Sequence, residues 1–353
     1  MGIIFKGADR FLHNFGGNNT ILGINSGNFT MTGIQNTAVG SNSLYSNSTG
    51  TTNTALGLSS LYFNTTGNQN SAFGHQSLYS NTTGVRNSAL GYQALFNSTS
   101  GNNNTASGHL SMYFNTIGSG NSAQSYYSLF SNTTGDFNTA MGYQSLNSNT
   151  TGCQNTALGY SSGSLITVGS NLTVIGNNAQ PTSGVANNQI TLGNNAVTSL
   201  RCNVQTITSL SDIRDKKNIK DLTLGLDFLM KIKPRLFNWD KREWYENNIS
   251  DGTKLQEIPT AGFIAQELDE VQTNENAEWL NLVLKDNPEK IEASYGNLLP
   301  VMVKAMQELK TENDMLKDRL SKFEQIVNEL ASDKKTSLSL INCNIPILKE
   351  GQK

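Results

Sequence analysis

Residues 211–219, with the sequence SDIRDKKNI, hold the side chains that are best suited to chemistry. A serine hydroxyl at its ordinary pKa is a poor nucleophile and needs a neighbouring base. A lysine amine can be that base only where burial lowers its pKa enough to leave it neutral. On the residues alone a simpler interpretation is open, in which Ser211 and Asp212 cap a helix while Lys216 and Lys217 lie in solvent.

Other catalytic and metal-binding chemistries find little support in the sequence. Glycoside hydrolysis normally uses two carboxylates that flank the scissile bond, but the first 200 residues contain only Asp9 and Asp136, which are far apart. Cys153, Cys202 and Cys343 are too few and too scattered for a disulfide framework or a metal site. No phosphate-binding loop or dinucleotide fingerprint is present. We therefore expect no cofactor, no metal and no glycosidase activity.

Charge is distributed very unevenly along the chain. The charged side chains of residues 1–200 are Lys6, Asp9, Arg10, Arg86 and Asp136, although the whole chain has 25 basic and 27 acidic residues. This contrast predicts a boundary near residue 200. No basic patch suited to nucleic acid and no apolar run long enough for a membrane span is present, and residues 1–17 lack the apolar core of a secretory signal. A virion component, made in the host cytoplasm and released by lysis, would fit these features.

A 17-residue repeat dominates the first half of the chain. The triplet Asn-Thr/Ser-Ala recurs at a constant step of 17 residues, and Asn19 extends the series one unit back. The triplets begin at Asn36, Asn53, Asn70, Asn87, Asn104, Asn121, Asn138 and Asn155. Each unit reads as a short strand, an apolar anchor and an Asn-Thr-Thr-Gly turn, whose glycine we expect to supply a positive φ. A parallel β-solenoid or a trimeric β-roll follows from this pattern.

Two aromatic columns keep the same step. One column is Tyr45, Tyr62, Tyr79, Phe96, Tyr113 and Phe130. The other is His75, Tyr92, His109, Tyr126, Tyr143 and Tyr160. Ring-on-ring packing that stabilises the solenoid is the first interpretation, and an exposed strip that stacks on host glycans is the second. The many Asn-x-Ser/Thr triplets read as turns, since the turn consensus generates them.

Beyond residue 210 several ordered motifs carry a resemblance. After residues 211–219 come Gly225-Leu226-Asp227, Ile232-Lys233-Pro234 with Phe237 and Trp239, then residues 262–267 (GFIAQE) and 295–298 (YGNL). Over about residues 205–330 the sequence resembles the C-terminal intramolecular chaperone of phage endosialidases, tailspikes and tail fibres. The repeats separately resemble the heads of trimeric adhesins.

The resemblance implies one autoproteolytic cut by a serine–lysine dyad, made after trimerisation. It assigns Ser211 as the nucleophile, Lys216 as the base and Leu210–Ser211 as the scissile bond. Asp212, Arg214 and Glu267 are implied as supporting residues.

A heptad pattern follows the motifs. Apolar residues at steps of three and four form a seam typical of a coiled coil, with a polar asparagine in one a-type position. The seam is Leu299, Met302, Met306, Leu309, Asn313, Leu316, Leu320, Phe323, Val327 and Leu330. Its length and the resemblance together favour a homotrimeric coiled coil, and the core helix of a monomer is the alternative.

The sequence thus predicts a mainly β protein in six parts, ending in a small α+β domain and a coiled coil. These are an N-terminal cap or attachment segment (1–18), the repeat stalk (19–160), a β neck (161–210), the chaperone and autopeptidase (211–297), the coiled coil (298–331) and a tail (332–353). The expected function is a homotrimeric tail fibre that binds a host surface receptor, a glycan among the candidates, and another virion protein through its N-terminus. A cellular trimeric adhesin that keeps the chaperone uncleaved is the alternative. A membrane-tethered transcription factor is disfavoured, because the sequence has neither a basic DNA-binding domain nor a membrane span.

Overall fold

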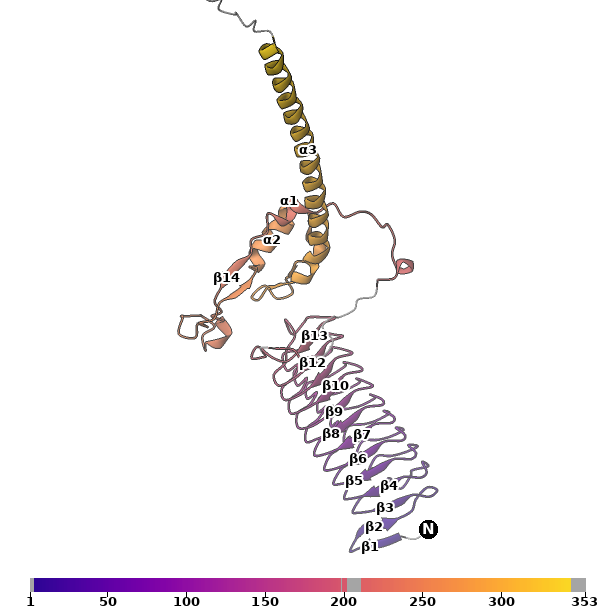
Figure 1. Ribbon diagram of the computed structural model, residues 1–353. Helices are drawn as coiled ribbons and strands as arrows, with labels where there is room; N and C mark the ends of the chain where they lie inside the picture. Colours follow the sequence, from indigo (N-terminus) through magenta and orange to yellow (C-terminus); the bar gives the residue numbers. More distant parts are fainter. Residues whose placement is uncertain (1–2, 198, 202–210, 344–353) are drawn as a thin grey trace, which may run out of the picture. The chain divides into compact units, whose positions relative to one another are not determined.

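The computed structural model describes residues 3–197, 199–201 and 211–343, with side chains as far as Ser332. The chain divides into two compact units, Met1–Ile207 and Thr208–Lys353 (Figure 1). The sequence predicted a boundary near residue 200, and the two units meet between residues 207 and 208. Each unit is described separately below.

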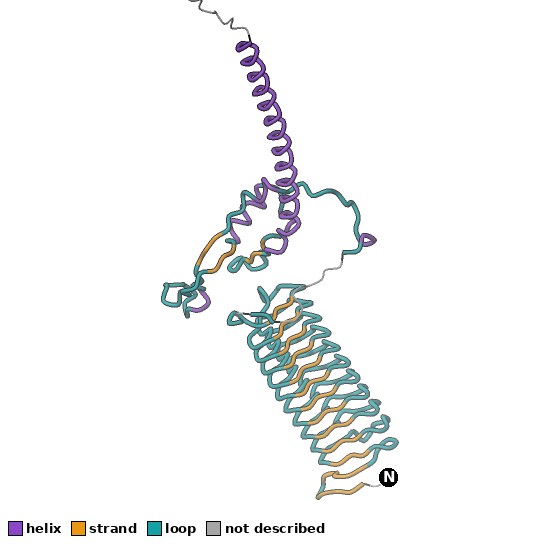
Figure 2. Tube along the Cα trace, viewed as in Figure 1, coloured by secondary structure: helices purple, strands orange, loops and turns teal. Residues whose placement is uncertain are grey.

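The first unit is a β-solenoid built on one 13-stranded sheet whose strands follow sequence order (Figure 2). An antiparallel hairpin of β1 (Ile3–Lys6) and β2 (Asp9–His13) begins it, and β2 pairs antiparallel with β3 (Thr20–Leu22). All later strands pair in parallel. They are β4 (Thr37–Val39), β5 (Thr54–Leu56), β6 (Ser71–Phe73), β7 (Ser88–Leu90), β8 (Thr105–Ser107), β9 (Ser122–Gln124), β10 (Thr139–Met141), β11 (Thr156–Leu158), β12 (Thr173–Ile175) and β13 (Ile190–Leu192).

The 17-residue repeat sets the register of this sheet. Thr37 pairs with Thr54 and Ala38 with Ala55, so equivalent residues of successive units lie beside each other. The central alanine of each repeat strand is buried, because successive strand residues alternate between the two faces and alanine admits close backbone approach. The leucine column fills the same core: Leu44, Leu61, Leu78, Leu95, Met112, Leu129 and Leu146 are all fully buried. The predicted parallel β-solenoid is confirmed.

The positive φ values fall on other residues than the turn glycine. Leu61 has φ 50°, and its equivalents in the leucine column share this left-handed conformation. Gly67, the turn glycine, does not have a positive φ. Glycine is required there because there is no room for a side chain: an added Cβ would lie 2.4 Å from Asn64 Oδ1 and 2.5 Å from Gly84 O. The expectation for the turn glycine was therefore wrong, since crowding between rungs, and not its torsion angle, requires glycine there.

Buried asparagines connect the rungs. Asn53 donates its backbone N–H to Asn36 Oδ1 at 2.9 Å, and Asn36 Nδ2 donates to Gly50 O at 2.9 Å. The same pair of bonds recurs in the following units. Asn64, which begins an Asn-x-Thr triplet, is fully buried, as expected of a turn residue and not of a glycosylation acceptor.

Because each unit bonds only to its neighbours, the solenoid should tolerate the loss of a whole unit. Deletion of residues 87–103 removes one 17-residue repeat and brings equivalent residues back into register. We expect it to keep the strand signature in circular dichroism and to shift Tm by only a few degrees, roughly the effect of 1 kcal/mol. Deletion of residues 87–94 alone breaks every column beyond it and should abolish cooperative unfolding. Equal behaviour of the two deletions would contradict the register.

The second unit is a small α+β assembly with a long terminal helix. Its elements are η1 (Ile213–Asp215), α1 (Leu226–Leu229), β14 (Arg235–Phe237), η2 (Arg242–Trp244), β15 (Thr260–Gly262), α2 (Ala265–Asn274), η3 (Glu278–Leu280), β16 (Val283–Leu284), β17 (Glu292–Ala293), η4 (Tyr295–Leu298) and α3 (Leu299–Cys343). β14 pairs with β15 and β16 with β17, each antiparallel. Phe228, Leu268, Leu282 and Val301 belong to its buried core.

One face of α3 packs on its own domain. Val301 and Ala305 are buried, and Glu308 Oε2 accepts the N–H of Leu226 at 2.7 Å at the start of α1. This bond and the Lys304 ammonium lower the pKa of Glu308. A Cβ on Gly225 would lie 2.1 Å from Glu308 Oε2, so the glycine lets the carboxylate reach the backbone. Glu308 therefore joins α1 to α3.

The helix also continues beyond the expected end of the coiled coil at residue 331. α3 extends to Cys343. Loss of the heptad pattern does not end a helix, and between Pro300 and Pro346 the sequence contains neither glycine nor proline. The tail expected from residue 332 is therefore helical as far as Cys343.

Candidate functional site

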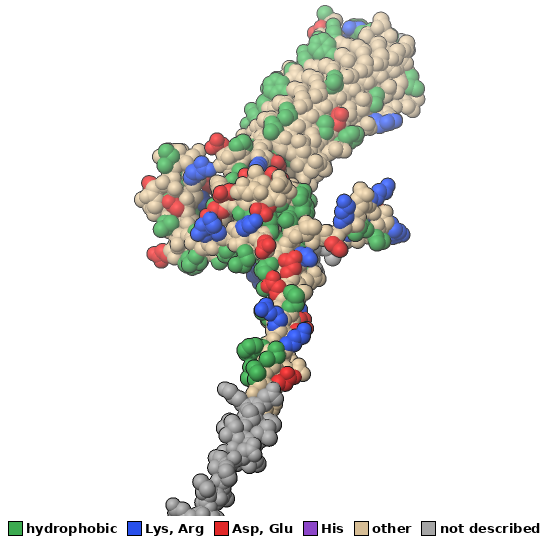
Figure 3. Space-filling view, turned by 90° about the horizontal axis from the view of Figure 1, so that it is seen from above, with side chains coloured by type: hydrophobic (Ala, Val, Ile, Leu, Met, Phe, Trp, Pro, Cys, Tyr) green, Lys and Arg blue, Asp and Glu red, His purple; other side chains and the backbone are tan. Residues whose placement is uncertain are grey.

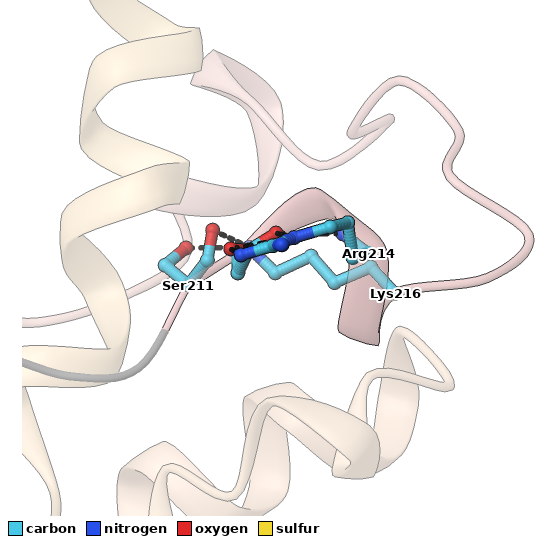
Figure 4. A network of polar contacts seen from close by, with 4 residues as sticks. Ser211, Arg214 and Lys216 are labelled. Atoms are coloured by element: carbon cyan, nitrogen blue, oxygen red, sulfur yellow. Dashed lines mark hydrogen bonds and ion pairs between the residues drawn. The ribbon is translucent and has the colours of Figure 1, made fainter.

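Ser211 and Lys216 lie in contact at the start of the second unit (Figure 4). Lys216 Nζ lies 2.5 Å from Ser211 Oγ and 3.2 Å from the carbonyl oxygen of the same residue. A nucleophile and its base must lie within hydrogen-bond reach of each other, at roughly 2.6–3.2 Å. The pair that the family resemblance selected is in contact within one chain, at a distance just below this range.

A single 3-10 turn, η1, brings the two side chains together. Asp212 is its N-cap, with extended backbone angles and a side chain that accepts the N–H of Arg214 at 2.9 Å. The Arg214 guanidinium binds both oxygens of Asp212, at 2.6–3.1 Å. At the other end Lys216 donates its backbone N–H to Ile213 O at 3.1 Å. The turn reverses the chain, so that the lysine side chain returns to Ser211.

The hydrogen bonds from Arg214 lower the pKa of Asp212, its side chain contributing more than its backbone N–H. Asp212 therefore stays ionised and keeps the turn closed. The two interpretations of residues 211–219, a cap and a nucleophile–base pair, are compatible. Asp212 caps a turn, as the simpler interpretation held, and that turn holds Lys216 against Ser211.

The site is open to solvent in the single chain. Residues 211–220 are all exposed, and the side chains of Arg214 and Asp212 keep 86% and 40% of their accessible surface. The single chain therefore provides the contact between Ser211 and Lys216 but buries neither residue.

Glu267 does not belong to the turn η1 that holds Lys216 against Ser211. It is in α2 and binds Arg235 of β14, with Oε2 2.9 Å from Arg235 Nε. The Arg235 guanidinium lowers the pKa of Glu267. The geometry thus gives Glu267 a role in joining β14 to α2. Leu210, on the other side of the expected scissile bond, lies outside the described residues.

The seam of α3 is exposed along its described length. Its apolar side chains retain 45–63% of their accessible surface, and Asn313 is also exposed. Charged and hydrophobic side chains both lie on the surface of this helix (Figure 3). An apolar stripe of this length is unusual on a monomer. The face with Val301 and Ala305 is already used within the chain, so the seam is free for other chains.

The two aromatic columns form stacked ladders. In the column from His75 to Tyr160, ring centroids of neighbouring units lie 4.9–5.4 Å apart. Tyr126 and Tyr143 are inclined by only 10°, so the rings stack face to face along the solenoid. Burial, followed by the neighbours Tyr127 and Tyr143, raises the pKa of the Tyr126 hydroxyl. The faces of the rings within this column are covered by neighbouring rings, so a ligand would contact the ring edges.

The second unit also has an open pocket of about 860 Å³, lined by Phe237, Trp239, Phe263 and Tyr295 among others. Neither Ser211 nor Lys216 lines it. Among the described residues no group of three His, Cys, Asp or Glu side chains could hold a metal ion. Within the same residues no helix is both long and apolar enough to cross a membrane.

Residues 211–276 match the family model described as chaperone of endosialidase. The match begins at Ser211 and ends just after α2, so it covers a minor part of the chain. Proteins with this domain are self-cleaving chaperones, and a solenoid of about ten turns with 17-residue spacing fits a fibre that carries one. No curated protein and no solved structure showed significant similarity to the chain.

Proposed function

We propose that the chain is a homotrimeric phage tail fibre whose C-terminal domain directs trimer folding and then releases itself by cutting the Leu210–Ser211 bond. The observation that carries the proposal is the 2.5 Å contact between Lys216 Nζ and Ser211 Oγ, at the first residue of the family match. Ser211 is the nucleophile, Lys216 is the base, and Asp212 and Arg214 position them through the turn.

The chemistry of such a cut can be written from these residues. Neutral Lys216 takes the Ser211 hydroxyl proton as Oγ attacks the carbonyl carbon of residue 210. The C–N bond breaks, the proton passes to the new amine of Ser211, and residue 210 is held as an ester on Oγ. Water then hydrolyses the ester, giving a carboxylate on residue 210 and restoring the serine hydroxyl. The net reaction consumes one water molecule and needs no cofactor.

Trimerisation supplies the missing burial in this proposal. Lys216 is exposed in the single chain, and an amine becomes a general base near neutral pH only when desolvation lowers its pKa. A trimer that closes over residues 211–216 would therefore activate the lysine only after assembly. Removal of the chaperone would then make unfolding of the fibre irreversible, so its stability becomes kinetic.

Two exposed surfaces support a trimer. The first is the α3 seam, where Asn313 at an a-type position would fix register and strand number. The second is the outward column of the solenoid sheet, where Leu56, Leu90 and Leu158 remain 46–55% exposed. Ser107 and Gln124 interrupt this column between Leu90 and Leu158. Exposed apolar patches on either side of them are of the kind that marks interaction sites.

The proposal also includes attachment to a host. The ladder of His75, Tyr92, His109, Tyr126, Tyr143 and Tyr160 is the candidate receptor surface, with a glycan among the possible ligands. Because the ring faces are stacked on each other, a ligand would contact ring edges and tyrosine hydroxyls. Residues 1–18 would contact another virion protein, and the fibre would be part of the virion. The alternative is a cellular trimeric adhesin or structural fibre that keeps the domain as an uncleaved trimerisation module.

Intact-mass measurement of the purified full-length chain tests the proposal, with hydroxylamine present in a parallel sample. We expect two fragments, 1–210 and 211–353, and a hydroxamate on residue 210 in the parallel sample, because hydroxylamine attacks an ester faster than water does. A chain that stays whole while it forms trimers would instead favour the uncleaved module.

A further inference from the structure

A second buried asparagine column follows the turns of the solenoid. Asn64 Nδ2 donates to Asn47 Oδ1 of the preceding unit at 2.7 Å and to Gly67 O of its own turn at 3.1 Å. The same two bonds recur where Asn132 follows Asn115, to Asn115 Oδ1 at 2.7 Å and to the turn glycine of its own unit at 3.0 Å. Each amide therefore has one partner in the unit before it and one in its own turn.

Ser98 interrupts this column. Asn81 stands one unit before it and Asn115 one unit after it, and all three residues are fully buried. Asn81 Oδ1 and Ser98 Oγ have no hydrogen-bond partner among the described residues. Both lie where the amide of an asparagine at position 98 would be. Unpartnered buried polar atoms are uncommon in native proteins and point to a ligand.

Two further groups that would bond to an asparagine amide at position 98 also face this position. Gly101 O is equivalent to Gly67 O, and it accepts Asn87 Nδ2 at 2.7 Å but no turn asparagine of its own unit. Asn115 Nδ2 donates one hydrogen to Gly118 O at 3.0 Å. In Asn132 the second amide hydrogen is donated to the asparagine of the preceding unit. The second hydrogen of Asn115 would be donated in the same direction, toward position 98. Asn115 Nδ2 lies 3.2 Å from a Cβ built on Gly101, so it stands over this turn.

We infer that the unit at Ser98 binds one ordered water molecule in place of the absent amide. The water donates to Asn81 Oδ1 and Gly101 O, and it accepts from Asn115 Nδ2 or from the Ser98 hydroxyl. This matches the amide it replaces, which would donate twice and accept once. Buried waters typically make about three hydrogen bonds to otherwise unsatisfied groups. The site makes the two asparagine segments one continuous polar column.

Two substitutions of similar shape separate a wet site from a dry one. Ser98→Asn displaces the water but reproduces its bonds, so Tm of the full-length chain should rise by about 2–4 °C. Ser98→Leu displaces the water with an apolar group. It leaves Asn81 Oδ1 without a partner and Gly101 O with Asn87 Nδ2 alone, so Tm should fall. If the site is dry, leucine fills a void and Tm should rise in both variants, which would overturn the inference.

A crystal structure of the full-length chain at a resolution that shows internal waters provides a readout independent of folding yield. We expect density within hydrogen-bond distance of Asn81 Oδ1, Ser98 Oγ and Gly101 O. Asn132→Ser is the matched control, because it creates the same arrangement in another unit and should create a second such peak. Absence of density at Ser98 while other internal waters are visible would refute the site.

Discussion

We expect Ser211→Ala to leave the chain at its full length of 353 residues, because the substitution removes the only atom proposed to attack the scissile bond. Removal of a serine nucleophile or of its base can cost on the order of 10⁶ in kcat. Lys216→Ala should therefore block the cut as completely. Lys216→Arg should do so too, since a guanidinium is permanently protonated and cannot act as a base. Denaturing gels and intact mass measure the result.

Lys217→Ala is the matched control for this prediction. Lys217 is the adjacent lysine and is also exposed, but the contact with Ser211 Oγ belongs to Lys216. The control should be cut at a rate close to that of the native chain, and all of these variants should still form trimers. Normal cutting by Lys216→Ala, or loss of cutting only in Lys217→Ala, would assign the base to a different residue.

Leu316→Asp should leave the protein monomeric and uncut. Leu316 is 59% exposed in the single chain and lies in the α3 seam, so an aspartate there costs little until chains associate. In a trimer it would bury three carboxylates without partners, at a cost of several kcal/mol each. Because the proposed cut requires assembly, both trimer and fragments should be lost together. Native mass spectrometry and intact mass report the two losses separately.

Met315→Asp is a control one residue away. Met315 is 55% exposed, much like Leu316, but it lies outside the seam. The same charge should therefore leave assembly and cutting nearly unchanged. If both aspartates abolish the trimer, or neither does, the seam has been assigned to the wrong face of the helix.

The sequence was informative where one residue type does one job in every unit. Alanine at the centre of each repeat strand and leucine at each anchor mark the core, so the 17-residue step predicted both the strands and their register. The contact between Ser211 and Lys216 could not be worked out from spacing alone. It depends on a 3-10 turn closed by Asp212 and Arg214, and the family resemblance pointed to it.

Other features could not be predicted because no local pattern encodes them. Leucine disfavours the left-handed region, so the conformation of Leu61 follows from the packing of the whole coil. The bond between Glu308 and the N–H of Leu226 joins residues 82 positions apart. The bond between Glu267 and Arg235 spans 32 positions and assigns Glu267 to a different contact from the one expected.

The central claim is that assembly of three chains activates the cut between Leu210 and Ser211. The most direct test refolds the full-length chain over a range of protein concentrations and follows intact mass with time. We predict a fragment that begins at Ser211 and appears faster at higher concentration, because the site is completed by association. A chain that remains whole at every concentration, or that is cut at a rate independent of concentration, would contradict the claim.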